Sequence, residues 1–230
     1  GTLNILKQAK KLRAKHFFFS DTSAEYDNIL GEENYPTAET SAPNTVTPIG
    51  YYAITKMAAS QFVRSYGETH GFGTTLFRYT NIYGPSMNLE RDIPPVVGSF
   101  ASRLFDGKTP IIYGDGSKRR DFLHIDDLTD FHIAALESRG NKKGSETYNA
   151  GLGKNYSILQ VYNKVKKSCK SIMNGTVALV EYKADQPNEA HITLANIDKA
   201  KKDLGWSPKI SFEEGVEKTV RGLWEMRNDS

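Results

Sequence analysis

Two short apolar runs, each preceded by a helical pattern, constrain the fold of this chain most. Residues 16–20 (HFFFS) and 74–80 (TTLFRYT) have the aromatic and β-branched composition of buried strands. Apolar residues recur at helical spacing in residues 1–15 and again from Ala59 to Tyr66. Residues 21–50, polar and punctuated by Gly and Pro, predict a long loop. This alternation of helices and strands predicts an α/β fold whose parallel sheet is covered by helices.

The rest of the chain carries further helix and strand patterns. We expect helices at residues 93–108, 126–138 and 158–170, and strands at residues 110–113 and 177–182. Gly67 is predicted to end the helix that begins near residue 50. Asn196 is predicted to cap a helix that stops at Gly205, and Ser211 with Glu214 predicts a capping box for the last helix.

Composition narrows the classes of function. The chain has 230 residues, 38% of them hydrophobic, and a net charge of only +3 with both signs interspersed, so a core is expected and a basic stripe for nucleic acid is not. Cys169, the single cysteine, excludes an internal disulfide; its lysine-rich surroundings predict an exposed helix and an incidental thiol. Because no apolar run is long enough to span a membrane, we expect a cytoplasmic protein that acts on small molecules.

Tyr52 and Lys56 are the first candidates for catalysis. They lie one helical turn apart at the start of a predicted helix, on the same face. A free tyrosine is a poor base at neutral pH, but a neighbouring ammonium favours the phenolate, which then accepts a proton from a sugar hydroxyl. A surface pair is the other interpretation of this common spacing, and the surrounding motifs decide between the two.

Several segments, in order, resemble the extended short-chain dehydrogenase/reductase family, and within it the NAD-dependent nucleotide-sugar epimerases and dehydratases. They are FFFSDTSAEY (17–26), the Tyr-x-x-x-Lys helix, FRYTNIYGP (77–85), IYGDGSKRRDFLHIDDL (112–128), YNAG (148–151) and DKAKKDLGWSPKISFEEGV (198–216). The resemblance implies a partial Rossmann-type, doubly wound parallel sheet with a smaller C-terminal α/β substrate lobe. It assigns residues 1–81 and 122–150 to the NAD-binding domain, and residues 82–121 and 151–230 to the substrate lobe.

The resemblance also implies the roles of individual residues around NAD. Tyr52 is the acid/base, Lys56 lowers its pKa and bonds the nicotinamide ribose, and Thr22 shares the hydrogen bond to the C4 oxygen of the sugar. Ser20 and Tyr79 belong to the cofactor-binding positions. Without the family, Thr22 is equally well explained as a turn residue at a strand end.

A second set of implied residues binds the nucleotide sugar. Asn81 contacts it, and Arg120 forms a fork onto its diphosphate. Gln186 stands where epimerases usually carry a second diphosphate-binding arginine, and Glu189 stands where an aspartate holds the uridine ribose. We therefore expect weaker diphosphate binding or a different substrate.

Other polar residues receive no chemical role. His124 is predicted to be a structural histidine, and Arg119 a solvated charge. The remaining histidines show no metal-ligand spacing, so no metal is expected. Asp27 replaces a family glycine, which predicts an altered turn below the active site.

The triplet Thr22-Ser23-Ala24 selects among reactions. By the resemblance, the family's dehydratases carry a triplet like Thr-Asp-Glu at these positions, and its sugar-acid decarboxylases carry one like Thr-Ser-Glu. In this chain the first acid, Glu25, comes one position too late for elimination. The resemblance thus implies C4 epimerisation of a UDP-hexose through a 4-keto intermediate, with NAD restored in each cycle. A nucleotide-sugar decarboxylase, a 4,6-dehydratase and a non-catalytic binding protein are the alternatives, and the sugar and base stay open.

The glycine-rich turn with which the family begins has no counterpart here. Gly1-Thr2 instead matches a "GT" at the start of the family's fourth helix, so we expect about 80 to 100 residues of the dinucleotide domain to be missing. The chain is then a fragment, a protein complemented by another chain, or a natural remnant. The resemblance further implies a homodimer through the Tyr-Lys helix, with Met57, Ser60, Gln61 and Arg64 on its outward face.

Overall fold

The structure is a computed structural model that describes residues 1–26, 34–41, 50–91, 94–175, 178–186 and 189–229; Asp27 lies outside these residues. The described helices are α1 (Thr2–Lys11), α2 (Gly50–His70), α3 (Val96–Phe105), α4 (Ile125–Arg139), α5 (Ile158–Met173), α6 (Asp198–Leu204) and α7 (Phe212–Asn228), with a 3-10 turn η1 (Ser23–Tyr26). The described strands are β1 (His16–Thr22), β2 (Gly73–Tyr79), β3 (Asn81–Tyr83), β4 (Ile111–Tyr113), β5 (Arg119–His124), β6 (Ser145–Ala150), β7 (Asn155–Ser157) and β8 (Glu181–Lys183).

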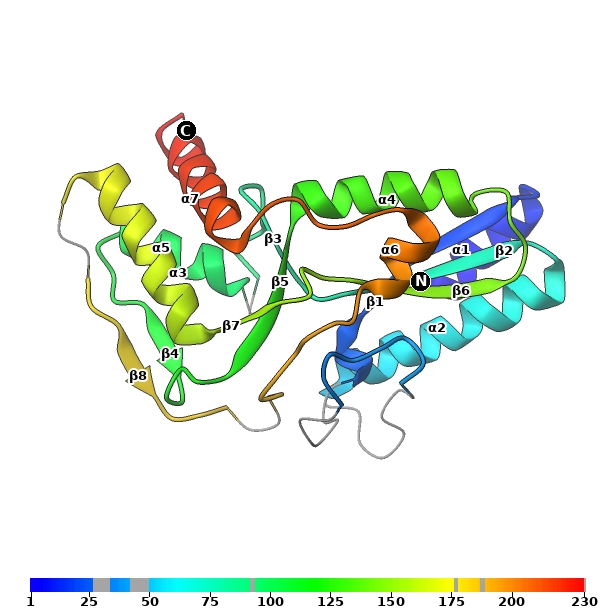
Figure 1. Cartoon of the computed structure of the whole chain (residues 1–230), viewed down its shortest axis with the longest axis horizontal. Coiled ribbons are helices and arrows are strands. Elements are labelled where there is room, and N and C mark those ends of the chain that lie inside the picture. Colours follow the sequence, from blue (N-terminus) through cyan, green and yellow to red (C-terminus); the bar gives the residue numbers. More distant parts are fainter. Residues whose placement is uncertain (27–33, 42–49, 92–93, 176–177, 187–188, 230) are drawn as a thin grey trace.

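The first lobe is a parallel sheet in the order β1-β2-β6, with helices on both faces (Figure 1). Successive side chains of a strand point to opposite faces, and β2 shows the result. Leu76 packs in a core with Leu6 of α1 and Val63 of α2, whereas Phe77 packs with Phe131 of α4 on the other face. The two-sided burial explains why the apolar runs of the sequence are nearly continuous.

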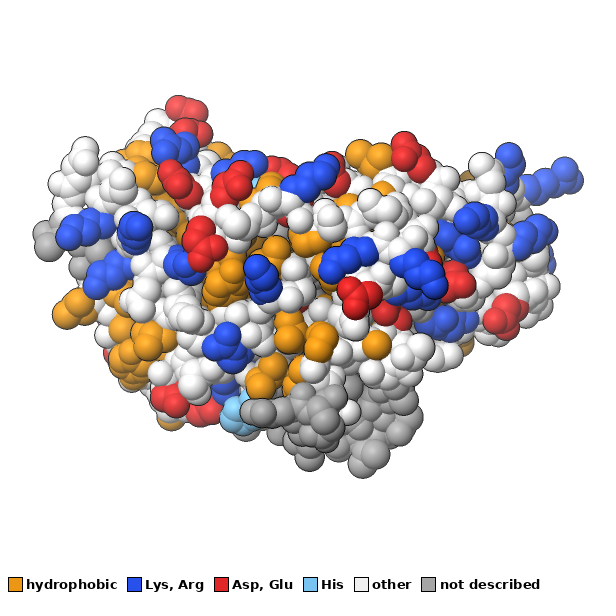
Figure 2. Space-filling view, viewed as in Figure 1, with side chains coloured by type: hydrophobic (Ala, Val, Ile, Leu, Met, Phe, Trp, Pro, Cys, Tyr) orange, Lys and Arg blue, Asp and Glu red, His pale blue; other side chains and the backbone are white. Residues whose placement is uncertain are grey.

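The second lobe gathers α3, α5 and α7 around its own core, which includes Phe100, Val165 and Val216. Two small sheets accompany these helices, β3-β5-β7 and β4-β8. In Figure 1, β5 runs between the two lobes, and its side chains serve both: Phe122 is buried in the second core and Leu123 in the first. On the face drawn in Figure 2, basic and acidic side chains are interspersed over both lobes.

The helix α2 ends three residues later than predicted. Gly67 lies inside the helix, where a Cβ would clash with the Thr74 methyl group and lie 3.0 Å from the Phe72 carbonyl oxygen. Glycine is therefore needed for close packing of α2 against β2. The chain reverses at Gly71 instead, whose φ of 74° lies in the left-handed region that favours glycine.

Of the two predicted helix caps near the C-terminus, one differs in detail from the structure. Asn196 is not the residue directly before α6, because the helix begins at Asp198 after Ile197; its side-chain oxygen still accepts the Asp198 N–H at 2.8 Å. Ser211 caps α7 as predicted and accepts the Glu214 N–H at 3.2 Å.

The solvent exposure of several residues corrects the sequence analysis. Cys169 is fully buried, because the apolar face of α5 packs into the second core while the lysines around it face outward. Ser60 is buried too, and Arg64 is half-buried and donates to the hydroxyls of Ser145 and Thr147 on β6. Neither belongs to an outward face of α2. None of the described helices combines the length and the apolar character needed to cross a membrane.

Candidate active site

A cavity of about 290 Å³ lies where the carboxyl ends of β1 and β2 meet the second lobe. Thr22 and Tyr79 are register partners at the ends of these strands, so their side chains reach the same edge of the sheet. Six of the predicted site residues line the cavity: Thr22, Tyr52, Tyr79, Asn81, Arg120 and Glu189. They come from β1, α2, β2, β3, β5 and the segment before α6, so the fold brings together residues that are up to 167 positions apart in the sequence.

The Tyr52–Lys56 pair stands at the N-terminal turn of α2. The Tyr52 side chain is 59% exposed and lines the cavity. The Lys56 ammonium donates to the Ser20 carbonyl at 2.7 Å and lies 6.0 Å from the centroid of the Tyr52 ring. An ammonium has three donors, so Lys56 keeps hydrogen-bonding capacity for a ligand while its charge stays beside the tyrosine.

Thr22 and Tyr79 line the cavity at the ends of β1 and β2. The Thr22 hydroxyl accepts the Ala24 N–H at 3.2 Å, the turn-type bond of a strand end, and its own O–H can still donate. The Tyr79 hydroxyl is 3.1 Å from Ser20 Oγ and 2.6 Å from Nε2 of His132 on α4. Burial raises the pKa of Tyr79 to about 12, so Tyr79 stays neutral. No sequence motif pointed to His132, which lies within α4.

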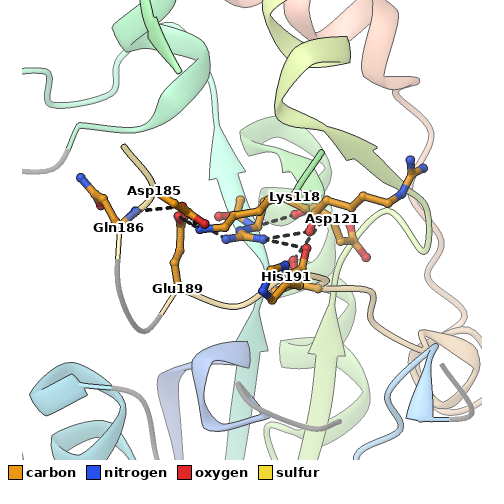
Figure 3. Close-up of polar contacts among 10 residues, drawn as sticks. Lys118, Asp121, Asp185, Gln186, Glu189 and His191 are labelled. Carbon is orange, nitrogen blue, oxygen red and sulfur yellow. Dashed lines mark hydrogen bonds and ion pairs between the residues drawn. The ribbon is translucent and has the colours of Figure 1, made fainter. Parts of the chain in front are cut away.

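The predicted substrate residues are separated by the structure into two groups. Asn81 lines the cavity and donates to the Asp121 carbonyl at 3.0 Å, and Arg120 donates to Glu189 at 2.9 Å. Gln186 does not line the cavity. In Figure 3 its side chain points away from Lys118 and Glu189. Lys118, which was not among the predicted site residues, pairs with Glu189 at 2.8 Å and also with Asp185.

A buried charged cluster lies beneath the cavity, on the α2 side of the sheet. Arg78 pairs with Glu25 at 2.8 Å and donates to the Tyr26 hydroxyl at 2.7 Å. Asp21 is the register partner of Arg78, and its carboxyl oxygens have no hydrogen-bond donor in the part of the chain that the structure describes. Burial raises the pKa of Asp21 to about 8; the Glu25 carboxyl also raises it, and Arg78 opposes both effects. Glu25 is fully buried and does not line the cavity.

Three polar residues of β5 prove to be structural. His124 caps α4 by accepting the Asp126 N–H, in agreement with the sequence interpretation, and burial lowers its pKa. Arg119 is bonded to the Asn155 side chain at 2.8 Å, so it is not the solvated charge that was predicted. Asp121 accepts N–H groups from Leu152, Gly153 and Ala195, and burial raises its pKa to about 7. Within the described ranges, no group of three or more potential ligands could hold a metal ion.

Comparison with family models matches residues 1–151 to the NAD dependent epimerase/dehydratase family. This chain belongs to that family. The match covers well over half of the chain, and it confirms the family that the ordered sequence segments indicated. The predicted α/β fold is confirmed as well, since the solved structures that resemble this one include Rossmann-fold epimerases.

Individual relatives carry several enzyme names. The chain is 33% identical to a UDP-glucuronate 4-epimerase of Thermodesulfobacterium geofontis and 31% identical to a dTDP-D-glucose 4,6-dehydratase of Mus musculus, with 99% of the chain aligned in each case. It spans 64% and 60% of the lengths of these two proteins. The crystal structure of UDP-glucose 4-epimerase from Thermotoga maritima with UDP-glucose superposes with a TM-score of 0.85, at 30% identity, over 98% of this chain and 69% of that chain.

Proposed function

We propose that this chain carries the acid/base and sugar-nucleotide-binding residues of an NAD-dependent 4-epimerase that acts on a UDP-hexose. The observation that supports this most is the shared cavity: an exposed tyrosine beside a lysine, a threonine hydroxyl and an arginine face one space of about 290 Å³. The names of the relatives, which include UDP-sugar 4-epimerases, support the same reaction.

The burial of Glu25 supports epimerisation over dehydration. Elimination of water needs an acid/base beside the C5–C6 bond of the sugar. Ser23 and Ala24 line the cavity and bring no carboxyl group, and Glu25, the next acid along the chain, is buried against Arg78. The carboxylate that does line the cavity, Glu189, is paired with Lys118 and Arg120, at the charged end of the site. Among the described residues that line the cavity, no carboxylate is thus placed with Ser23 and Ala24, where the sugar ring would lie.

The chemistry of this chain's own residues follows from their positions. Tyr52, as phenolate, removes the proton of the sugar O4 and returns it after the sugar has turned over. The Lys56 ammonium lies 6.0 Å from the centroid of the Tyr52 ring, and the Ser20 carbonyl holds it in place beside the proton-transfer site. The Thr22 O–H donates to O4, since the oxygen of the same hydroxyl is already engaged by Ala24.

Ser20, Tyr52, Lys56 and Tyr79 fit the nicotinamide-ribose end of NAD. They lie at the ends of β1 and β2 and at the start of α2, and the Lys56 ammonium, which donates one hydrogen bond to the Ser20 carbonyl, has further N–H donors for the ribose. When bound, NAD supplies the reversible oxidation at C4. The residues of this chain position C4, exclude water and move the O4 proton.

Assembly and location stay predictions from the sequence. A homodimer through α2 is supported by the apolar side chains that this helix exposes, Tyr51, Ile54 and Phe62. Of the four residues predicted for the outward face, Gln61 is exposed and Met57 half-buried. The cytoplasm is proposed as the location because UDP-sugars and NAD are the expected ligands.

The test is an incubation of the full-length polypeptide with NAD and UDP-glucose, or UDP-glucuronate, followed by proton NMR of the sugar. Inversion at C4 is the expected result. Formation of a 4-keto-6-deoxy sugar would show a dehydratase, and loss of CO₂ from UDP-glucuronate would show a decarboxylase. Binding of the UDP-sugar without any turnover would show a non-catalytic binding protein and would overturn the proposal.

A further inference from the structure

Two cations, Lys118 and Arg120, lie buried at the charged end of the cavity. Their side chains are 6% and 10% exposed. One carboxylate joins them: Glu189 accepts from Lys118 with Oε2 at 2.8 Å and from Arg120 with Oε1 at 2.9 Å. Figure 3 shows Glu189 and Asp185 converging on Lys118 from the same segment of chain. Each oxygen of one anion thus binds a different cation.

The cations are fixed independently of Glu189, whereas Glu189 is held mainly by them. Arg120 also donates to the backbone carbonyls of Arg119 and His191, at 3.0 and 3.4 Å, and Lys118 is also paired with Asp185. The Glu189 side chain is 39% exposed, and it lines the cavity, which Lys118 does not. Glu189 can therefore leave toward water without disturbing the two cations, and its departure opens Lys118 to the cavity.

The charges favour a second anion at this place. Burial lowers the pKa of Lys118, but its bonds to Asp185 and Glu189 outweigh burial, and the net shift is upward, so the ammonium stays charged. With Glu189 displaced, two cations face the cavity against the single carboxylate of Asp185. Two oxygens of a phosphate group span neighbouring N–H donors as a carboxylate does, and they carry more charge.

We propose that Lys118 joins Arg120, whose diphosphate contact the family resemblance already implies, in binding the substrate diphosphate, and that Glu189 is an internal counter-ion which the diphosphate displaces. The inference rests on the proposed function for the identity of its ligand. It gives Lys118 a binding role, and it gives Glu189 a role opposite to the ribose contact that the family resemblance implies. The step is an exchange of ion pairs, so no bond is made or broken.

Calorimetric titration of the full-length protein with inorganic pyrophosphate tests the subsite without any sugar or turnover. In E189Q, pyrophosphate binding should tighten about three- to tenfold, because the competing charge is gone. In K118M, it should weaken roughly tenfold or more, because a charge-assisted hydrogen bond is lost. E213Q is the matched control: Glu213 forms an exposed ion pair with Lys164 and does not line the cavity, so the affinity should stay unchanged.

Titration with UDP and the turnover assay separate the possible failures. If E189Q weakens UDP binding and leaves pyrophosphate binding unchanged, Glu189 is a ribose ligand and the inference is wrong. If pyrophosphate does not bind, or binds equally to wild type, K118M and E189Q, the inference also fails, even where the enzyme turns over UDP-sugar. The expected pyrophosphate pattern without any turnover would instead support the subsite and reject the epimerase. Should K118M fail to fold, the pyrophosphate affinity of E189Q alone still tests the inference, because this variant retains both cations.

Discussion

At the scale of single residues, the proposed chemistry depends most on one phenol oxygen, that of Tyr52. We expect Y52F to lower kcat by about 10²- to 10⁴-fold, the usual contribution of general acid/base catalysis. UDP binding should stay within twofold, because the cavity keeps its shape. Y51F is a matched control, since Tyr51 is 89% exposed and does not line the cavity. Equal activity of Y52F and Y51F in the NMR assay would remove Tyr52 from the mechanism.

Asp21 makes a different prediction, about pH and stability. Its pKa is raised to about 8 in the folded protein and is near 4 in an unfolded chain, so between pH 4 and 8 the native state binds the additional proton. The free energy of unfolding should therefore fall as the pH rises through this window, by up to about 1.4 kcal/mol per pH unit from this group. With Glu25 and Arg78 beside it, one retained proton leaves the cluster neutral.

The measurement is urea denaturation at several pH values from 5 to 8, for wild type and D21N. The amide cannot ionise, so D21N should show a shallower dependence of stability on pH than wild type. D115N serves as a control, because Asp115 is exposed and its pKa is lowered by the Ser117 hydroxyl and N–H. Its effect on the pH dependence should appear only below about pH 4. Identical slopes for D21N and wild type would mean that Asp21 is ionised in the folded protein.

At the scale of elements, the position of α2 against β2 sets the distance between Tyr52 and the strand ends. We expect G67A to lower the free energy of unfolding by about 1–3 kcal/mol, because the added methyl group overpacks this contact. The double variant G67A/T74S should recover part of the loss, since serine lacks the methyl group that clashes. G175A, whose Cβ would lie 3.6 Å from its nearest neighbour, should change stability little in thermal denaturation. A neutral G67A would refute the close packing.

The elements also show what a sequence can predict here. β2 was predicted because it is buried on both faces, β1 because its three phenylalanines pack partly into the cores on both faces of the sheet, and α7 because Ser211 caps it. The three-residue strands β3 and β7 carry no such signal, since each exists through its pairing with β5. The contact of Lys118 with Glu189 spans 71 residues of chain and was not foreseen, although Lys118 stands in a quoted segment and Glu189 was itself a candidate site residue. The family resemblance thus identified the candidate site residues, whereas the ion pairs among them became visible only in the folded structure.

At the scale of the whole molecule, β5 and Asp121 tie the two lobes together. Phe122 and Leu123, successive residues of β5, enter different cores. The Asp121 carboxylate accepts N–H groups from the segment after β6 and from Ala195, at 2.8 to 3.2 Å. The boundary predicted between residues 121 and 122 therefore falls inside a strand that both lobes share. Two lobes joined in this way should unfold as one unit.

The two tryptophans make this cooperativity measurable. Trp206 is buried in the first core, and Trp224 packs against Phe105 in the second. In W224F the remaining Trp206 reports on the first lobe, and in W206F the remaining Trp224 reports on the second. Urea titration should show a single unfolding transition in each variant. Adding D121N should lower the stability seen by both probes to the same extent, by about 1–3 kcal/mol, because buried N–H groups lose an acceptor. D130N, which affects only an exposed ion pair with Lys209, should shift neither probe by more than about 0.5 kcal/mol. If D121N shifted one probe and not the other, the lobes would be independent folding units and the cavity between them would be free to change shape.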